Sequence, residues 1–190
     1  MEVDWNKINA FHMDEYVGLD KDSPQGFGNF LKDRLFSKVS LRQTHYLNGN
    51  ADDLEEECNR YAQLLEKYPT DIVCLGIGEN THLAFNDPHV ALFNDPKIVK
   101  VVDLDEKCRT QHVNDGCFVA LQEVPANALT ITIPALFKST YAYAVVPGEL
   151  KANAIYHTLH DEVEEKYPST ILRRHPNAVL FIDENSAKKI

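Results

Sequence analysis

The chain has 190 residues, of which 44% are hydrophobic, and it carries 19 basic against 29 acidic residues for a net charge of −10. This length fits a single domain with a core of its own. The acidic balance argues against nonspecific binding to nucleic acid and against an anionic membrane surface as partners.

Targeting signals and cysteine pairs are not visible in the sequence. No run approaches the roughly 20 apolar residues of a membrane span, and the first residues lack the basic and apolar regions of a signal peptide. None of the four cysteines belongs to a CxxC pair. We therefore expect reduced thiols in a cytoplasmic protein, and neither a disulfide framework nor a zinc framework.

Strand and helix signals alternate in the first half of the chain. Residues 7–11 predict a short strand, and the Ser-Pro pair at 23–24 predicts the N-cap and first position of a helix that runs to about residue 39. Residues 52–68 predict an amphipathic helix, because apolar side chains recur there at helical spacing. Residues 71–75 predict the strand that follows.

The second half continues this alternation. Strands are predicted at residues 98–104, 128–133, 141–146 and 178–182. Pro134 is expected to end the second of these, and Pro147-Gly148 to lead into a helix over residues 149–159. The pattern predicts one α/β domain over residues 1–190, with a three-layer, Rossmann-like, mostly parallel sheet and helices on both faces.

The most informative segment is GIGENTHLAFNDP, residues 76–88. An apolar run ends in two glycines, and an amide, a hydroxyl, an imidazole and a carboxylate follow within a few residues. Functional groups of such folds gather at the carboxyl ends of strands. By this reasoning three polar clusters, at residues 12–16, 80–87 and 148–151, are expected to meet at one rim.

Those clusters together resemble the glucosamine-6-phosphate deaminase (isomerase) family. The matching stretches are FHMDEYVGL, SPQGFGNFL, YLNGNA, GIGENTHLAFNDP and VPGELKANA. The sister 6-phosphogluconolactonases share the fold but usually carry a different acidic motif and a GHTAS-like turn. The resemblance implies conversion of glucosamine 6-phosphate and water to fructose 6-phosphate and ammonia, with no metal and no organic cofactor. Family members range from monomers to hexamers, so a homo-oligomer is left open.

The resemblance also implies roles for particular residues. Asp14 matches the general base that removes the C2 proton, and His82 matches the acid/base that opens the sugar ring. Asn80 and Asp87 match the two groups that accompany this histidine. Without the motif, the plainer interpretation of Asp14 would be an acidic residue that caps a helix or lies in a loop. The plainer interpretation of Asp87 would be an Asx turn before Pro88. Asp14 and His82 are expected to face each other across one sugar-sized hollow.

Substrate binding is expected from two glycines and a lysine. Gly76 and Gly78 allow close approach of backbone to the sugar, and Lys151 matches the phosphate-binding lysine near a helix start. Two positions depart from the family pattern. Asp87 stands where glutamate is common, so it is expected to reach His82 through water or from a shifted backbone. Thr81 stands where glycine is usual.

The resemblance further implies that an N-terminal strand–helix unit with a phosphate-cradling loop is missing, so that the chain is either a fragment or a truncated paralogue. Two other functions stay open for this reason. One is a noncatalytic sugar-phosphate-binding protein. The other is an enzyme with a different substrate, such as a galactosamine-6-phosphate deaminase/isomerase or a 6-phosphogluconolactonase.

Overall fold

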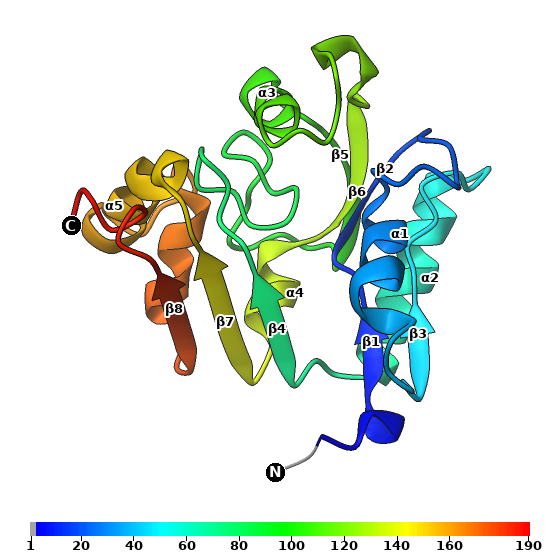
Figure 1. Cartoon of the computed structure of the whole chain (residues 1–190). Helices are drawn as coiled ribbons and strands as arrows, with labels where there is room; N and C mark the ends of the chain where they lie inside the picture. Colours follow the sequence, from blue (N-terminus) through cyan, green and yellow to red (C-terminus); the bar gives the residue numbers. More distant parts are fainter. Residues whose placement is uncertain (1–2) are drawn as a thin grey trace.

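The computed structural model describes residues 3–190. Two short strands from the N-terminal part of the chain form a small parallel pair (Figure 1). β1, Asn9–Phe11, pairs with β3, Gln43–His45, so that Ala10 lies opposite Thr44. The strand predicted at residues 7–11 is therefore present, two residues shorter, because a 3-10 turn occupies Trp5–Lys7.

A second sheet is antiparallel throughout. β2, Asp14–Tyr16, pairs with β6, Asn127–Ile131, and β6 pairs with β5, Val99–Asp103. Asp14 lies opposite Thr130 in this ladder. The prediction of one mostly parallel sheet is wrong in this region, since both pairings are antiparallel and residues 14–16, which were expected at the carboxyl rim, form a strand of their own.

The third sheet is parallel, as predicted. β4, Ile72–Leu75, and β8, Ala178–Ile182, flank β7, Tyr141–Val146. The bounds predicted for the last two strands are confirmed. The fold is thus α/β with mixed parallel and antiparallel sheets.

Five α-helices lie among the described residues and connect these strands. They are α1, Phe27–Leu31; α2, Leu54–Lys67; α3, Glu106–Asn114; α4, Ile133–Phe137; and α5, Ala152–His160. A π-helical turn at Lys32–Phe36 and 3-10 turns at Leu121–Glu123, Glu149–Lys151 and Pro168–Arg174 complete the set. α2 matches its prediction, and Asp53 caps it by accepting hydrogen bonds from the amides of Glu55 and Glu56.

Helix starts and one strand end differ from the predictions, and α5 begins at Ala152, after a 3-10 turn, and not at residue 149. The first helix begins at Phe27 and not after the Ser-Pro pair, because Ser23 instead accepts a turn hydrogen bond from the Gly26 amide through its carbonyl. β6 ends at Ile131, and Pro134 lies in the first turn of α4, where a missing N–H costs nothing.

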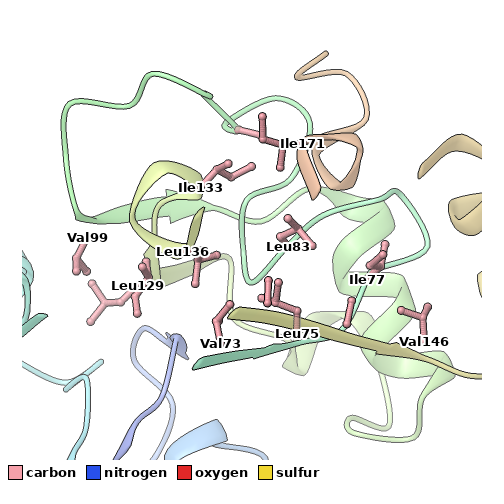
Figure 2. Close-up of a cluster of buried hydrophobic side chains, with 14 of the residues drawn as sticks. Val73, Leu75, Ile77, Leu83, Val99, Leu129, Ile133, Leu136, Val146 and Ile171 are labelled. Carbon is pink, nitrogen blue, oxygen red and sulfur yellow. The ribbon is translucent and has the colours of Figure 1, made fainter. Parts of the chain in front are cut away.

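The core lies between the parallel sheet, the loop after β4 and the elements that follow (Figure 2). Val73, Leu75, Ile77 and Leu83 come from the β4 region, and Ile133 and Leu136 from α4. A second cluster surrounds the buried Tyr16 ring and includes the aromatic residues Phe85 and Phe118. These two clusters fix the loop that carries the most distinctive motif.

One face of the parallel sheet is exposed. Alternate side chains of β7, such as Ala142 and Ala144, are buried, whereas Tyr141 and Val145 are exposed. Exposed apolar side chains of β4 and β8 lie in register with them, among them Ile72 and Phe181. Helices on both faces were predicted, because parallel sheets are normally covered on both sides. For this sheet, that prediction is wrong within residues 3–190.

Within the described residues, no helix combines the length and the apolar composition needed to cross a bilayer.

Candidate functional site

The loop after β4 folds back on itself so that Asn80 holds His82. The Asn80 Oδ1 oxygen accepts from the His82 backbone amide at 3.1 Å and lies 2.7 Å from His82 Nδ1. Because an amide oxygen can only accept, His82 Nδ1 must carry the proton in this contact. The other ring nitrogen, Nε2, then has a free lone pair.

Asp87 supplies the negative charge beside this imidazole. Its Oδ1 lies 3.1 Å from His82 Nδ1 and accepts from Asn80 Nδ2 at 2.9 Å, while Oδ2 accepts from the Asp105 amide at 3.4 Å. Burial alone disfavours the charge, but the hydrogen bond and charge of His82, with the Asn80 and Asp105 hydrogen bonds, hold the pKa of Asp87 below its usual value. Of the two alternatives expected for Asp87, the contact through water is wrong, because the carboxylate reaches His82 directly, and the shifted backbone stays a prediction.

Thr81 and Gly78 shape this loop. Thr81 has φ of 72°, in the left-handed region that favours glycine, and its hydroxyl is buried without a hydrogen-bond partner in residues 3–190. This explains physically why a glycine suits the position. A Cβ on Gly78 would overlap the His82 ring, so Gly78 gives the imidazole its space. A Cβ on Gly76 would meet nothing within 4 Å.

Asp14 and Glu15 are adjacent carboxylates with opposite environments. Burial, and then the charge of Glu15, raise the pKa of Asp14 to about 7. Glu15 accepts hydrogen bonds from the amides of Tyr16, Phe27 and Gly28 and lies 3.4 Å from His12 Nε2. Although burial opposes it, these contacts lower the pKa of Glu15.

Thr130 connects Asp14 to the loop that carries His82. It is the ladder partner of Asp14 in β6, and its hydroxyl oxygen accepts from the Phe85 amide at 3.1 Å. Asn86 Nδ2 donates to the Ile131 carbonyl beside it. The structure therefore connects the strand that carries Asp14 to the loop that carries His82, whereas a shared hollow between Asp14 and His82 stays a prediction.

α3 brings two further residues to this place that the sequence analysis did not assign. Asp105 caps the helix by accepting from the Cys108 amide at 2.6 Å, and Cys108 Sγ lies 3.6 Å from His112 Nε2. Both side chains are buried. Burial, and then the charge of His82, lower the pKa of His112 to about 4, which keeps its imidazole neutral. The Asp105 cap followed by a Cys and a His four residues apart is the signal that could have revealed them.

Lys151 ends the 3-10 turn that leads into α5 and is partly buried. Burial lowers its pKa, while Asp115, Glu79 and Cys108 act in the opposite direction, so its ammonium group lies near α3 and the loop after β4. None of the ion pairs formed among residues 3–190 involves Lys151. This partly buried cation is therefore available to an anionic group.

A cavity of about 250 Å³ lies beside β2 and α1. Its lining includes Glu15, Tyr16, Asn29, Tyr46 and Asn48 but none of the predicted site residues. The amide group of Asn29 already donates to the Lys21 and Ser23 carbonyls, so it serves to hold the loop before α1.

Residues 1–181 match the family described as glucosamine-6-phosphate isomerases/6-phosphogluconolactonase. A glucosamine-6-phosphate deaminase from Bacillus cereus (strain B4264) is 36% identical over 185 residues, which is 97% of this chain and 69% of the relative. The corresponding protein of Exiguobacterium sp. (strain ATCC BAA-1283 / AT1b) is 36% identical over 187 residues, 98% of this chain and 72% of the relative.

Solved structures give the same picture. A structure described as a monomeric glucosamine-6-phosphate deaminase superimposes with a TM-score of 0.86 at 34% identity, covering 95% of this chain and 74% of the other. A 6-phosphogluconolactonase from Thermotoga maritima shares the fold, with a TM-score of 0.73 at 24% identity over 96% of this chain and 75% of the other. The chain is thus shorter than the relatives that it matches.

Proposed function

Because the chain belongs to the glucosamine-6-phosphate isomerase/6-phosphogluconolactonase family, we propose that it is an amino-sugar-phosphate deaminase/isomerase. Its substrate would be glucosamine 6-phosphate, and its products fructose 6-phosphate and ammonia. The observation that carries this proposal is the Asn80–His82–Asp87 arrangement, which holds the proton on Nδ1 and leaves Nε2 free. A family match alone would support only the fold and the general class of substrate.

The first role is ring opening by His82. Its Nε2 takes the proton of the anomeric hydroxyl, the bond between C1 and the ring oxygen breaks, and the imidazolium returns the proton to that oxygen. Asp87 stabilises the transient positive charge, since its oxygen lies 3.1 Å from Nδ1. Asn80 supports the ring orientation because its Oδ1 accepts a hydrogen bond from Nδ1 and its Nδ2 donates one to Asp87.

The second role is proton transfer by Asp14. As a carboxylate it removes the C2 proton of the open-chain sugar, so that the bonding pair forms a C1–C2 double bond while the C1 oxygen takes up a proton from solvent, which is given back when the imine is hydrolysed. Return of the proton to C1 leaves a C2 imine, and water replaces its nitrogen to release ammonia. A pKa of about 7 suits a general base that must work near neutrality.

Lys151 is proposed to bind the phosphate. Its partly buried ammonium precedes the first turn of α5, where free backbone amides add favourable charge for an anion. Gly76, whose Cβ position faces open space, is proposed to let the sugar approach the backbone. Gly78 acts through His82, because its missing side chain leaves room for the imidazole.

A coupled assay for ammonia tests this function. The purified chain is expected to release ammonia from glucosamine 6-phosphate, and Asp14→Asn is expected to remove that activity. Galactosamine 6-phosphate and 6-phosphogluconolactone serve as the alternative substrates. Release of acid from the lactone without ammonia from either amino sugar would replace the deaminase proposal with the lactonase one. Asp71→Asn, at an exposed aspartate that precedes β4, is the control.

A noncatalytic sugar-phosphate-binding role is the second candidate. It is favoured by Thr81, which lies beside His82 where the family usually has a glycine and which takes a φ of 72°. This candidate predicts that fructose 6-phosphate or glucosamine 6-phosphate raises the unfolding temperature without turnover. Ammonia release at enzyme-like rates excludes it.

A further inference from the structure

Three buried side chains of different chemistry converge beside the proposed catalytic histidine. Donor atoms of His82, Asp87 and Cys108 all lie within 4.8 Å of one another. We propose that these residues form a binding site for a thiophilic divalent cation of the Zn²⁺ type, and that the bound ion inhibits the enzyme by occupying His82. The mixed nitrogen, oxygen and sulfur donor set is the one that Zn²⁺ takes in proteins.

The distances between donors suit a tetrahedral ion. Zinc binds nitrogen and oxygen at about 2.0–2.2 Å and sulfur at about 2.3 Å, which places its ligand atoms roughly 3.3–3.7 Å apart. His82 Nδ1 and Asp87 Oδ1 are 3.1 Å apart, and His112 Nε2 lies 3.6 Å from Cys108 Sγ. Small movements would therefore complete three ligand bonds, with the fourth position left for water or for His112.

The surroundings also favour a cation. Asp87 belongs to a second group of donors, with His89 and Asp105, whose ligand atoms again lie within 4.8 Å of one another. Asp105 Oδ2 lies 3.4 Å from Asn80 Nδ2, so a second carboxylate borders the first group. The buried carboxylate of Asp87 and the buried thiol of Cys108 gain from a divalent ion that replaces their missing solvation.

Binding forms the metal–ligand bonds and moves two protons. The Cys108 thiol releases its proton to solvent and binds as thiolate. His82 binds through Nδ1, the nitrogen that faces Asp87, so its proton moves from Nδ1 to Nε2 and the hydrogen bond to Asn80 is lost. With Nε2 protonated and Nδ1 on the metal, His82 cannot accept the anomeric proton. The inhibition rests on the proposed function, whereas the binding does not.

Cobalt binding tests the site without any assay of activity. Chelator-treated protein is titrated with Co²⁺, and the thiolate-to-cobalt charge-transfer band, the visible bands of tetrahedral Co²⁺ and proton release are followed. One ion and one thiol proton are expected per chain. Cys108→Ser is expected to weaken binding by roughly 100-fold or more, since even the loss of an outer-shell partner costs about 10- to 100-fold. Cys117→Ser, at an exposed cysteine, is the matched control and keeps the band.

Two further variants protect the test against simple misfolding. Cys108→Ala and His82→Gln are expected to lose the band while their far-UV circular dichroism and unfolding transitions remain cooperative. A band that survives Cys108→Ser but disappears in Cys117→Ser would overturn the proposal, and so would the absence of any charge-transfer band in folded wild-type protein.

Activity then tests the inhibition separately. If the protein is a deaminase, Zn²⁺ is expected to inhibit ammonia release by the wild type, and the remaining activity of Cys108→Ser is expected to resist the same concentration. Cys108-dependent cobalt binding in a chain with no deaminase activity would refute the proposed function but leave the metal site standing. Zn²⁺ that binds through Cys108 without affecting turnover would refute the inhibition.

Discussion

Asp14 and Asp87 are identical side chains, one in a strand and one in a loop, and the fold affects their acidity in opposite directions. Asp87 is fully buried, yet contacts from His82, Asn80 and the Asp105 amide lower its pKa. At Asp14, burial and then the charge of Glu15 raise the pKa to about 7. Burial opposes the charge of both carboxylates, and at Asp87 the surrounding donors outweigh it.

This contrast separates two tasks that one residue type can perform. A carboxylate that stays ionised can orient and stabilise an imidazole, whereas one that titrates near neutrality can take up and return a proton. We therefore infer that Asp87 positions His82 and that Asp14 is the base. The predictions below test this division, beginning with the largest expected effect.

Asp14→Asn should lower the turnover of glucosamine 6-phosphate by about 10²- to 10⁴-fold, the range attributed to a positioned general base. Ammonia release under saturating substrate measures this loss. The KM should change little, because the substituted amide keeps the shape of the side chain. Activity within tenfold of wild type would show that Asp14 is not the base.

Gly78→Ala tests whether the position of His82 matters as much as its presence. The new Cβ would overlap the imidazole ring and push it away from Asn80 and Asp87. A displacement of about 1 Å can cost roughly 100-fold in rate. Gly76→Ala is a control for the position of the ring and not for the rate, since its Cβ would meet no protein atom within 4 Å but would face the proposed sugar site. The chemical shifts of the His82 ring nitrogens should move in the first variant and not in the second.

Glu15→Gln addresses the charge that raises the pKa of Asp14. Removing this charge lowers the pKa of Asp14, so the base is ionised at lower pH and the acidic limb of the kcat/KM profile moves to lower pH. The shift should be roughly one pH unit, because one neighbouring charge contributes on the order of 1–4 kcal/mol and a pKa unit equals about 1.4 kcal/mol.

The control for this profile is Asp20→Asn, at an exposed aspartate that lines the same cavity as Glu15. Glutamine keeps one acceptor oxygen, so it can retain either the hydrogen bond that the Phe27 amide donates to Oε1 or the one that the Gly28 amide donates to Oε2, and it loses the other. An unchanged acidic limb would mean that Glu15 supports the loop but does not tune Asp14.

Local sequence patterns predicted the group around Asp87 and His82 well. Asn80, His82 and Asp87 lie within one short loop, so the chain itself brings them together, and the strand bounds at Tyr141–Val146 and Ala178–Ile182 also followed from apolar patterns. Their direct contact did not follow, because the reach of Asp87 depends on how the loop folds over Thr81.

The Asp14 side was harder to predict because it depends on long-range pairing. A three-residue strand such as β2 has too few residues for a visible period, and only its ladder with β6 shows it to be a strand. α3 was missed because Val113 and Cys108 are almost its only apolar residues, so no helical stripe appears. The only sequence signal for Cys108 and His112 was therefore their spacing behind the Asp105 cap.

The smallest expected effect is on stability, and its sign differs between the two carboxylates. The folded-state pKa of Asp14 lies above its ordinary value of 3.8, so the folded protein loses stability as pH rises from about 4 through 7. Asp14→Asn lacks this loss and should unfold at a higher temperature than wild type above pH 7, with no such gain below pH 4.

Asp87→Asn should instead lower the unfolding temperature at neutral pH, because the carboxylate that it removes accepts hydrogen bonds from Asn80 and the Asp105 amide. Each kcal/mol corresponds to about 2–4 °C in a chain of this size. Calorimetry at pH 4 and pH 8, with Asp71→Asn as the control, distinguishes the two, and shifts of equal sign would contradict the opposite tuning.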